Sequence, residues 1–208
     1  MSQFRARTTR FERELRQLAL TQRLLEYNAR TQTICALTGL TAHKVSVLRR
    51  GWNDSAERHR GPSPNSFTAL LRSPRTRMES ACLAVVLNRF GALPKRKAAG
   101  ASRWDLEGAE RLCDAFDFYR SLVPRSVISF EQMVLLSKGL RDPTCLRHER
   151  CQACGASMVI DPVARPNPHC DACTAQRRSA RLSSVPAADG SIPIRPPAEP
   201  RLITARHA

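Results

Sequence analysis

The sequence predicts a mainly α-helical protein: a helical body with a helix-turn-helix-like unit, followed by a C-terminal four-cysteine zinc-binding module. Aromatic residues make up only 5% of the 208 residues, so aliphatic side chains must fill a core that favours packed helices over a β-sandwich. Apolar residues recur at helical spacing over much of residues 10–140. Two C-x2-C pairs with 15 residues between them have the spacing of a four-cysteine zinc site.

The first predicted helix runs from about residue 10 into the thirties. Its wide apolar stripe indicates burial against a partner as well as the core. Gly39 interrupts the pattern, and Thr41 can cap a second helix that continues to about Arg50. The stripe of the first helix consists of Phe11, Leu15, Leu18, Leu25 and Ala29, widened by Leu20 and Leu24.

Residues 51–66 are rich in turn formers and predict a loop. Pro74 can open a helix that reaches about Phe90, and Gly91 with Pro94 ends it. Residues 94–103 are expected to form a basic, exposed linker. The core side of the helix is expected to carry Met78, Ala81, Cys82, Val85 and Val86.

Two further helices are predicted near residues 104–120 and 126–139. Asp105 is the expected start of the first, Ser126 or Ser129 the expected start of the second, and Gly139 the expected stop. The predicted domains are a helical DNA- and partner-binding domain over residues 1–140, a zinc-binding module over 141–180, and a Pro-rich tail over 181–208 that is expected to be disordered.

The cysteine pairs predict one Zn²⁺ per chain. Two residues between cysteines form a tight knuckle that directs both sulfurs to one point, and Gly155 can provide the turn after the first pair. A closed shell of four thiolates leaves no position for a substrate, so the site is expected to be structural. The predicted ligands are Cys151, Cys154, Cys170 and Cys173.

Three alternatives compete with this interpretation: unpaired or redox-active thiols, iron in a rubredoxin-like site, and replacement of a cysteine ligand by His148 or His169. Cys35, Cys82 and Cys113 fall on apolar helix faces and are expected to be small core residues.

The chain carries 34 Lys and Arg against 18 Asp and Glu, a formal net charge of +16. Because such an excess opposes compaction, it usually has a polyanionic partner; the alternative is a basic surface kept for solubility. Residues 41–103 carry 13 basic and 3 acidic side chains, whereas residues 104–140 carry 4 and 6. We therefore expect the anion-binding surface on residues 41–103 and internal scaffold over 104–140.

Residues 31–50 match a helix-turn-helix unit, in which Ile34, Leu40, Val45 and Leu48 supply the packing contacts around the turn at Gly39. The exposed face of the second helix can then enter a major groove. The alternatives are core packing with a solvated basic face, and a contact with a partner protein. The candidates for base-edge contacts are Thr41, His43 and Ser46, and those for phosphate contacts are Arg49, Arg50, Arg58, Arg60, Arg72, Arg75 and Arg77.

Several blocks, in order, resemble the FlhC family of bacterial flagellar transcriptional activators. The resemblance implies a mostly helical protein whose zinc ligands are the four cysteines named above. It also implies a hetero-oligomer with the small helical protein FlhD, promoter binding and recruitment of RNA polymerase. The loop after Trp52, the insertion PKRKAAGASR and the Pro-rich tail depart from the family pattern. The matching blocks are RLLEYNARTQTICALTGLTAHKVSVLRR, RGPSPNSF, RMESACLAVVLNRFG, FDFYRSL, and CQACGASMVI with HCDAC.

Together these features predict a zinc-containing, DNA-binding transcriptional activator. The resemblance implies that it acts on flagellar class II promoters with an FlhD-like partner. The alternative is an RNA- or ribosome-associated zinc-ribbon protein, which the scarcity of aromatic residues for base stacking disfavours. An enzyme is not expected, because the sequence has no glycine-rich phosphate loop or HExxH helix. The eight cysteines suit a reducing cytoplasm, and no apolar run approaches the roughly 18 residues of a membrane span.

Overall fold

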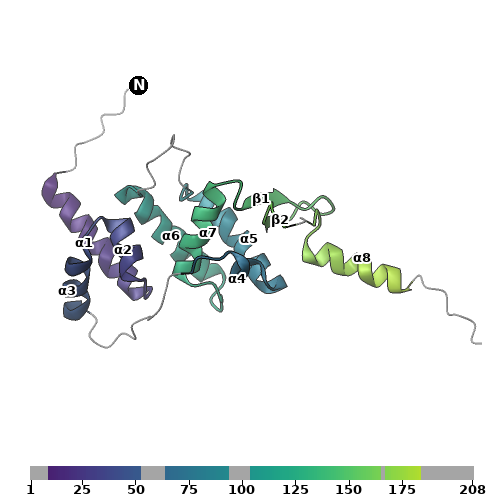
Figure 1. Ribbon diagram of the computed structural model, residues 1–208, viewed down its shortest axis with the longest axis horizontal. Coiled ribbons are helices and arrows are strands. Elements are labelled where there is room, and N and C mark those ends of the chain that lie inside the picture. Colours follow the sequence, from purple (N-terminus) through teal and green to yellow (C-terminus); the bar gives the residue numbers. More distant parts are fainter. Residues whose placement is uncertain (1–8, 53–63, 94–103, 165–166, 184–208) are drawn as a thin grey trace, which may run out of the picture.

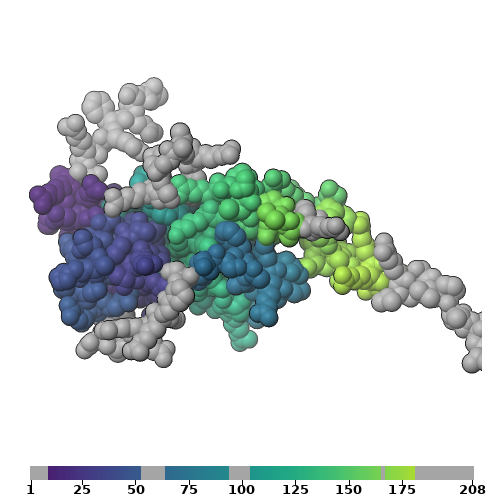
Figure 2. All heavy atoms as spheres, in the orientation of Figure 1, coloured from purple at the N-terminus to yellow at the C-terminus, as the bar shows by residue number. Residues whose placement is uncertain are grey.

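The computed structural model describes residues 9–52, 64–93, 104–164 and 167–183. It confirms the predicted fold class: helices form the body, and a two-stranded sheet with one further helix lies at one end of that body (Figure 1). Figure 2 shows the helical body as one packed mass from which the last helix projects. In chain order the elements are α1 (Arg10–Glu26), α2 (Thr31–Thr38), α3 (Ala42–Trp52), α4 (Thr68–Leu71), α5 (Pro74–Arg89), α6 (Leu106–Leu122), α7 (Phe130–Arg141), β1 (Arg147–Arg150), β2 (Ser157–Ile160) and α8 (Asp171–Ser183).

The prediction of one long helix from residue 10 into the thirties is wrong. Asn28 takes a φ of 55°, and the N–H groups of Asn28 and Ala29 turn back to the carbonyls of Leu25 and Leu24. This left-handed turn satisfies carbonyls at the end of α1 and stops it. A carboxylate oxygen of Glu131 on α7 then accepts the N–H of Arg30, so the start of α2 is held from a distant element.

Most of the predicted helix starts are confirmed. Asp105 is the N-cap of α6 and accepts the N–H of Gly108 at 2.8 Å. Ser129, rather than Ser126, caps α7, and Pro74 opens α5 directly after a capping Ser73. Thr41 Oγ1 accepts the N–H of Lys44 near the start of α3. These side chains satisfy N–H groups that a helix leaves without partners at its start.

The expected stop at Gly139 is wrong, because α7 continues through it to Arg141. A Cβ on Gly139 would come within 2.6 Å of side-chain atoms of both Leu146 and Phe67. The glycine therefore allows two apolar side chains to approach the helix backbone, which is a packing role rather than a terminating one.

The core side of α5 differs from the prediction. Ala81 and Val86 are buried as expected and Cys82 is half-buried, but Met78 is 68% exposed and Val85 is 43% exposed. The buried face is rotated because the polar side chains Glu79 and Ser80 lie inside, next to Leu83 and Leu87 on the same helix.

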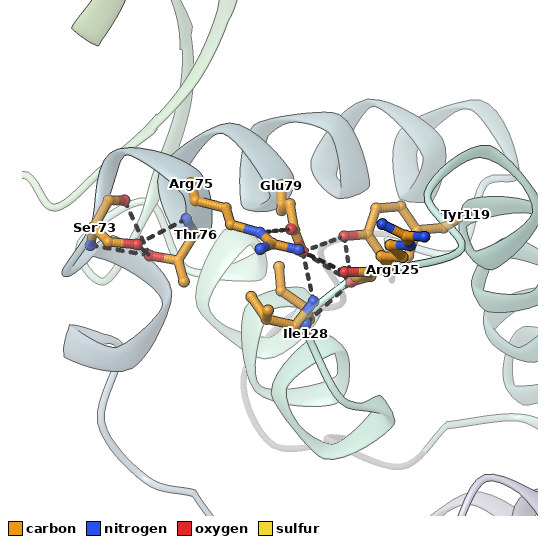
Figure 3. Close-up of polar contacts among 9 residues, drawn as sticks. Ser73, Arg75, Thr76, Glu79, Tyr119, Arg125 and Ile128 are labelled. Carbon is orange, nitrogen blue, oxygen red and sulfur yellow. Dashed lines mark hydrogen bonds and ion pairs between the residues drawn. The ribbon is translucent and has the colours of Figure 1, made fainter.

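Glu79 holds α5 to the loop that joins α6 and α7 (Figure 3). Its side chain is only 4% exposed. One carboxylate oxygen accepts Arg75 Nε, and the other accepts Tyr119 Oη, Ser126 Oγ and the N–H of Val127, all within 3.0 Å. Burial raises the pKa of the Tyr119 phenol, so that hydroxyl stays a donor.

A second polar cluster holds α1 against α6. Arg23 pairs with Asp114 and Asp117, and the hydroxyl of Tyr27 donates to Asp117 at 2.7 Å. The Tyr27 ring also contacts two phenylalanines, Phe116 on α6 and Phe130 on α7. As expected, α6 and α7 form internal scaffold, and they fix α1 and α2 on one side of the body.

Some predictions lie outside the described residues. They concern most of the loop over 51–66, the linker over 94–103 and nearly all of the tail over 181–208. Within the described residues, no helix combines the length and apolar character that crossing a membrane requires.

We expect Glu79→Gln to lower the free energy of unfolding by about 2 kcal/mol at pH 7, because it removes the charge from a buried acceptor of four hydrogen bonds. Burial raises the pKa of Glu79, but its hydrogen bonds outweigh that effect and hold the pKa below its ordinary value. The charge therefore stabilises the fold fully above the unfolded pKa of about 4.3, and this contribution is lost as the pH falls through the lower folded pKa.

Urea unfolding of both proteins between pH 7 and pH 3 measures this difference. Glu107→Gln is the matched control, since Glu107 is exposed and its ion pair among the described residues is with Arg111, one turn away on α6; it should change stability by less than about 0.5 kcal/mol. Equal stability of wild type and Glu79→Gln at pH 7 would contradict the role given to this carboxylate.

Candidate metal centre

The first cysteine pair lies in the turn between two paired strands. β1 and β2 are antiparallel, with Arg147 opposite Ile160. Gly155 has a φ of 71°, as the knuckle predicts, and its N–H donates to the carbonyl of Cys151 at 2.8 Å. The N–H of Cys151 donates to the carbonyl of Ala156, so the turn is closed by its own backbone.

The second pair lies at the start of α8. Cys170 directly precedes the helix, and its carbonyl accepts the N–H of Thr174 at 2.9 Å. Cys173 lies in the first turn of α8. The N–H of Gln152 in the first knuckle donates to the carbonyl of Pro168 at 3.0 Å, which holds the two knuckles opposite each other.

The four sulfurs converge on one point. The Sγ atoms of Cys151, Cys154, Cys170 and Cys173 all lie within 4.8 Å of one another, and Cys154 Sγ is 3.7 Å from Cys170 Sγ. Cys151 is buried, Cys154 is exposed and the other two are half-buried. The residues predicted as ligands are therefore positioned to hold one metal ion.

Two of these cysteines have strongly shifted pKa values. The N–H of Cys170 donates to Cys151 Sγ at 3.3 Å, and this and neighbouring backbone donors lower the Cys151 pKa to about 5. The pKa of Cys173 rises to about 12, because its thiol donates to the sulfurs of Cys154 and Cys170. The cluster thus shares its remaining protons among sulfurs that face one another, and a metal ion would displace those protons.

Neither histidine takes part in this cluster. His148 lies on β1 opposite Val159, and the Nε2 atom of His169 contacts Arg177 on α8. The described residues that gather as ligands are the four cysteines alone. Cys113 is fully buried, and Cys35 and Cys82 pack against the core, as predicted.

The module is attached to the body through α5. β2 packs against α5, and Val159 is buried in the same core as the helices. Arg77 on α5 binds both carboxylate oxygens of Asp171, at 2.9 and 2.8 Å, and also donates to the carbonyl of Leu71. Asp171 lies between the two cysteines of the second pair. Sequence reasoning missed this contact, although an acidic residue in the first turn of a helix was an available signal.

The helix-turn-helix-like unit has the predicted local structure. Gly39 ends α2 with a φ of 76°, and its N–H donates to the carbonyl of Cys35. Ile34 and Val45 are fully buried where α2 and α3 meet. Thr38, polar in an apolar position, is buried and donates its hydroxyl to the carbonyl of Ile34 at 2.7 Å.

The candidate DNA-contacting residues fall into separate groups. Thr41, His43, Ser46 and Arg50 are exposed at the start of and along α3. Arg49 turns back to donate to the carbonyl of Ala29. The remaining candidates lie elsewhere: Arg72, Arg75 and Arg77 in or beside α4 and α5, which Figure 1 shows away from α3, and Arg58 and Arg60 outside the described residues.

The two arginines on α5 that are candidates for phosphate contacts are engaged within the protein. Arg75 pairs with Glu79 and donates to the carbonyl of Arg125, and Arg77 pairs with Asp171. Of the described candidates for phosphate contacts, Arg50 and Arg72 are exposed without such a pairing. Arg75 and Arg77 carry structural contacts that the sequence did not predict.

The fold and the cysteine cluster define a mainly helical protein with a C-terminal four-cysteine metal-binding module. Comparison with known proteins does not narrow this class: no protein-family model matches the chain, and no curated protein matches it.

We expect Cys151→Ala to lose the metal and to destabilise the module, because three thiolates leave the ion without a closed shell. Elemental analysis and thermal unfolding of the purified protein measure the two effects. Cys145→Ala is the control: Cys145 is half-buried near the module but is not one of the converging ligands, so this variant should keep one metal ion per chain. Retention of a full equivalent of metal by Cys151→Ala would show that the ligands are assigned wrongly.

Proposed function

We propose that this chain is a zinc-stabilised, DNA-binding transcriptional activator that works in a hetero-oligomer with an FlhD-like partner on flagellar class II promoters. The observation that carries the proposal is the exposed face of α3, where Thr41, His43, Ser46 and Arg50 stand on a helix whose other side is buried through Val45. A short helix held this way against α2 has the form of a recognition helix.

Zinc is the ion that the donor set favours. Four thiolates suit tetrahedral Zn²⁺, whose Zn–S bonds of about 2.3 Å place neighbouring sulfurs about 3.8 Å apart. The separation of 3.7 Å between Cys154 Sγ and Cys170 Sγ agrees with that value. Bound zinc would supply folding free energy rather than chemistry, because four sulfurs fill its shell. The four cysteines are the residues that would hold it.

Double-stranded DNA is the polyanion that the charge and the α2–α3 unit favour together. The net charge of +16 provides sequence-independent affinity for phosphates. Base edges would be contacted from Thr41, His43 and Ser46, with Arg50 at the nearby backbone. Recruitment of RNA polymerase, the FlhD-like partner, the flagellar promoters and a cytoplasmic location rest on the resemblance and the sequence features described above.

Gel-shift titrations on a flagellar class II promoter test this proposal. We expect the slope of log K against log[salt] to fall by about 0.9 in magnitude for Arg50→Ala, since one phosphate contact is lost. The triple variant Thr41→Ala, His43→Ala, Ser46→Ala should bind the promoter at least about tenfold more weakly while keeping its non-specific affinity.

Arg111→Ala is the control, because that guanidinium pairs with Glu107 on α6 rather than lying on α3; its salt slope should match wild type. Promoter binding that does not respond to salt would overturn the proposal. Preferential competition by RNA over promoter DNA would instead favour the RNA- or ribosome-associated class.

A further inference from the structure

A set of large apolar side chains is exposed beside α5 and α6, which we call the α5–α6 apolar patch. Each of its five members is at least 43% exposed. Folded proteins rarely leave this much apolar surface gathered in one place without an interaction partner. The members are Met78 and Val85 on α5, Phe118 and Leu122 on α6, and Val127 in the following loop.

Several contacts join the elements that carry the patch. At the end of α5, the ring of Phe90 contacts that of Phe118, with centroids 5.4 Å apart. At the start of α5, Arg75 donates to the carbonyl of Arg125, and Glu79 accepts the N–H of Val127 (Figure 3). α6 and its following loop therefore contact α5 near both of its ends, and the exposed apolar side chains lie on the elements that these contacts join.

The scaffold beneath the patch is preorganised. Tyr119, which lies between Phe118 and Leu122 in the chain, is fully buried, and its hydroxyl donates a hydrogen bond to Glu79. The same carboxylate accepts Ser126 Oγ and fixes the backbone next to Val127. A surface already held in place loses little conformational entropy when a partner binds.

The charges around the patch indicate the chemistry of its occupant. Arg75, Met78, Val85 and Arg89 follow one another at helical spacing, so the exposed face of α5 is basic at both ends and apolar between. Arg89 and Arg125 are exposed and form no ion pair with an acidic side chain in the part of the chain that the structure describes.

We infer that the α5–α6 apolar patch docks a partner protein through an apolar helix face flanked by carboxylates. The apolar centre matches the apolar face, and the flanking carboxylates pair with Arg89 and Arg125. A second copy of this chain does not fit, because each copy carries a net charge of +16. DNA does not fit either, because phosphates gain nothing from apolar side chains. The inference deepens the partner-binding part of the proposed function and is independent of the α3 face.

The test measures binding of the purified full-length chain to the FlhD-like protein of the same genome, by titration calorimetry. Val85→Glu places a carboxylate in the centre of the patch and should weaken binding at least about tenfold. Arg89→Glu should weaken it and reduce its salt dependence. Val163→Glu is the matched control, since Val163 is 87% exposed in the metal module, outside the patch. Unchanged metal content and circular dichroism would show that each variant is folded.

If Val85→Glu weakens the complex and Val163→Glu leaves it unchanged, the inference is supported. If all variants bind equally tightly, the inference is overturned, but the proposal of an FlhD-like partner is not. If the wild type forms no complex with the FlhD-like protein, a photo-crosslinking residue introduced at position 85 tests in the native host whether another protein docks on the patch. A photo-crosslinking residue at position 163 is the control. One outcome is that the residue at position 85, but not the one at position 163, captures a protein whose cross-linked peptide is an acidic amphipathic helix, and that Arg89→Glu abolishes the capture. This outcome supports docking at the α5–α6 apolar patch and overturns the FlhD-like partner. If no such protein is captured, both the docking inference and the FlhD-like partner are overturned.

A membrane surface is the remaining occupant to exclude. Sedimentation with phosphatidylcholine–phosphatidylserine vesicles measures it. Vesicle binding that Val85→Glu abolishes would overturn the inference of a protein partner, and wild-type protein that stays in the supernatant would support it.

Discussion

The convergence of four sulfurs from two cysteine pairs that are 15 residues apart is the constraint on which the C-terminal part of the protein depends. β1 is exposed along its whole length, and α8 is exposed from Ala175 through Ala180. The module places few apolar side chains inside, chiefly Leu146 and Val159. So small a buried surface gives little hydrophobic stabilisation. A metal ion held by the two knuckles would supply the stabilisation that the small core does not, and would fix the start of α8 against the β1–β2 turn.

α5 connects that module to the rest of the molecule. One part of its surface receives β2 and the Arg77–Asp171 pair, another buries Glu79 against the loop after α6, and a third is the exposed stripe of the α5–α6 apolar patch. The α2–α3 unit lies at the opposite end of the body, held by α1 and Glu131. We therefore expect metal binding, partner docking and DNA contact to use different surfaces of one helical body.

Local signals in the sequence predicted the features that depend on few residues. The cysteine spacing identified the four residues whose sulfurs converge. Gly39, Gly155, Asp105 and Pro74 act where turn and cap chemistry placed them. Features that depend on distant side chains were missed. The break at Asn28 is stabilised by a capping carboxylate a hundred residues away, and Gly139 is required by the approach of Leu146 and Phe67. α5 buries a different face from the predicted one because Glu79 lies inside, and the periodicity of apolar residues does not reveal a buried carboxylate. Arg77 was interpreted from its charge alone, whereas its partner Asp171 becomes close only after folding.

X-ray absorption spectroscopy at the zinc edge, on the full chain purified without chelator, tests the central claim most directly. We predict one zinc per chain and a first shell of four sulfur scatterers at about 2.3 Å. A shell containing nitrogen or oxygen, or a soluble and cooperatively folded chain that carries no metal, would contradict the four-cysteine site from which the module is built.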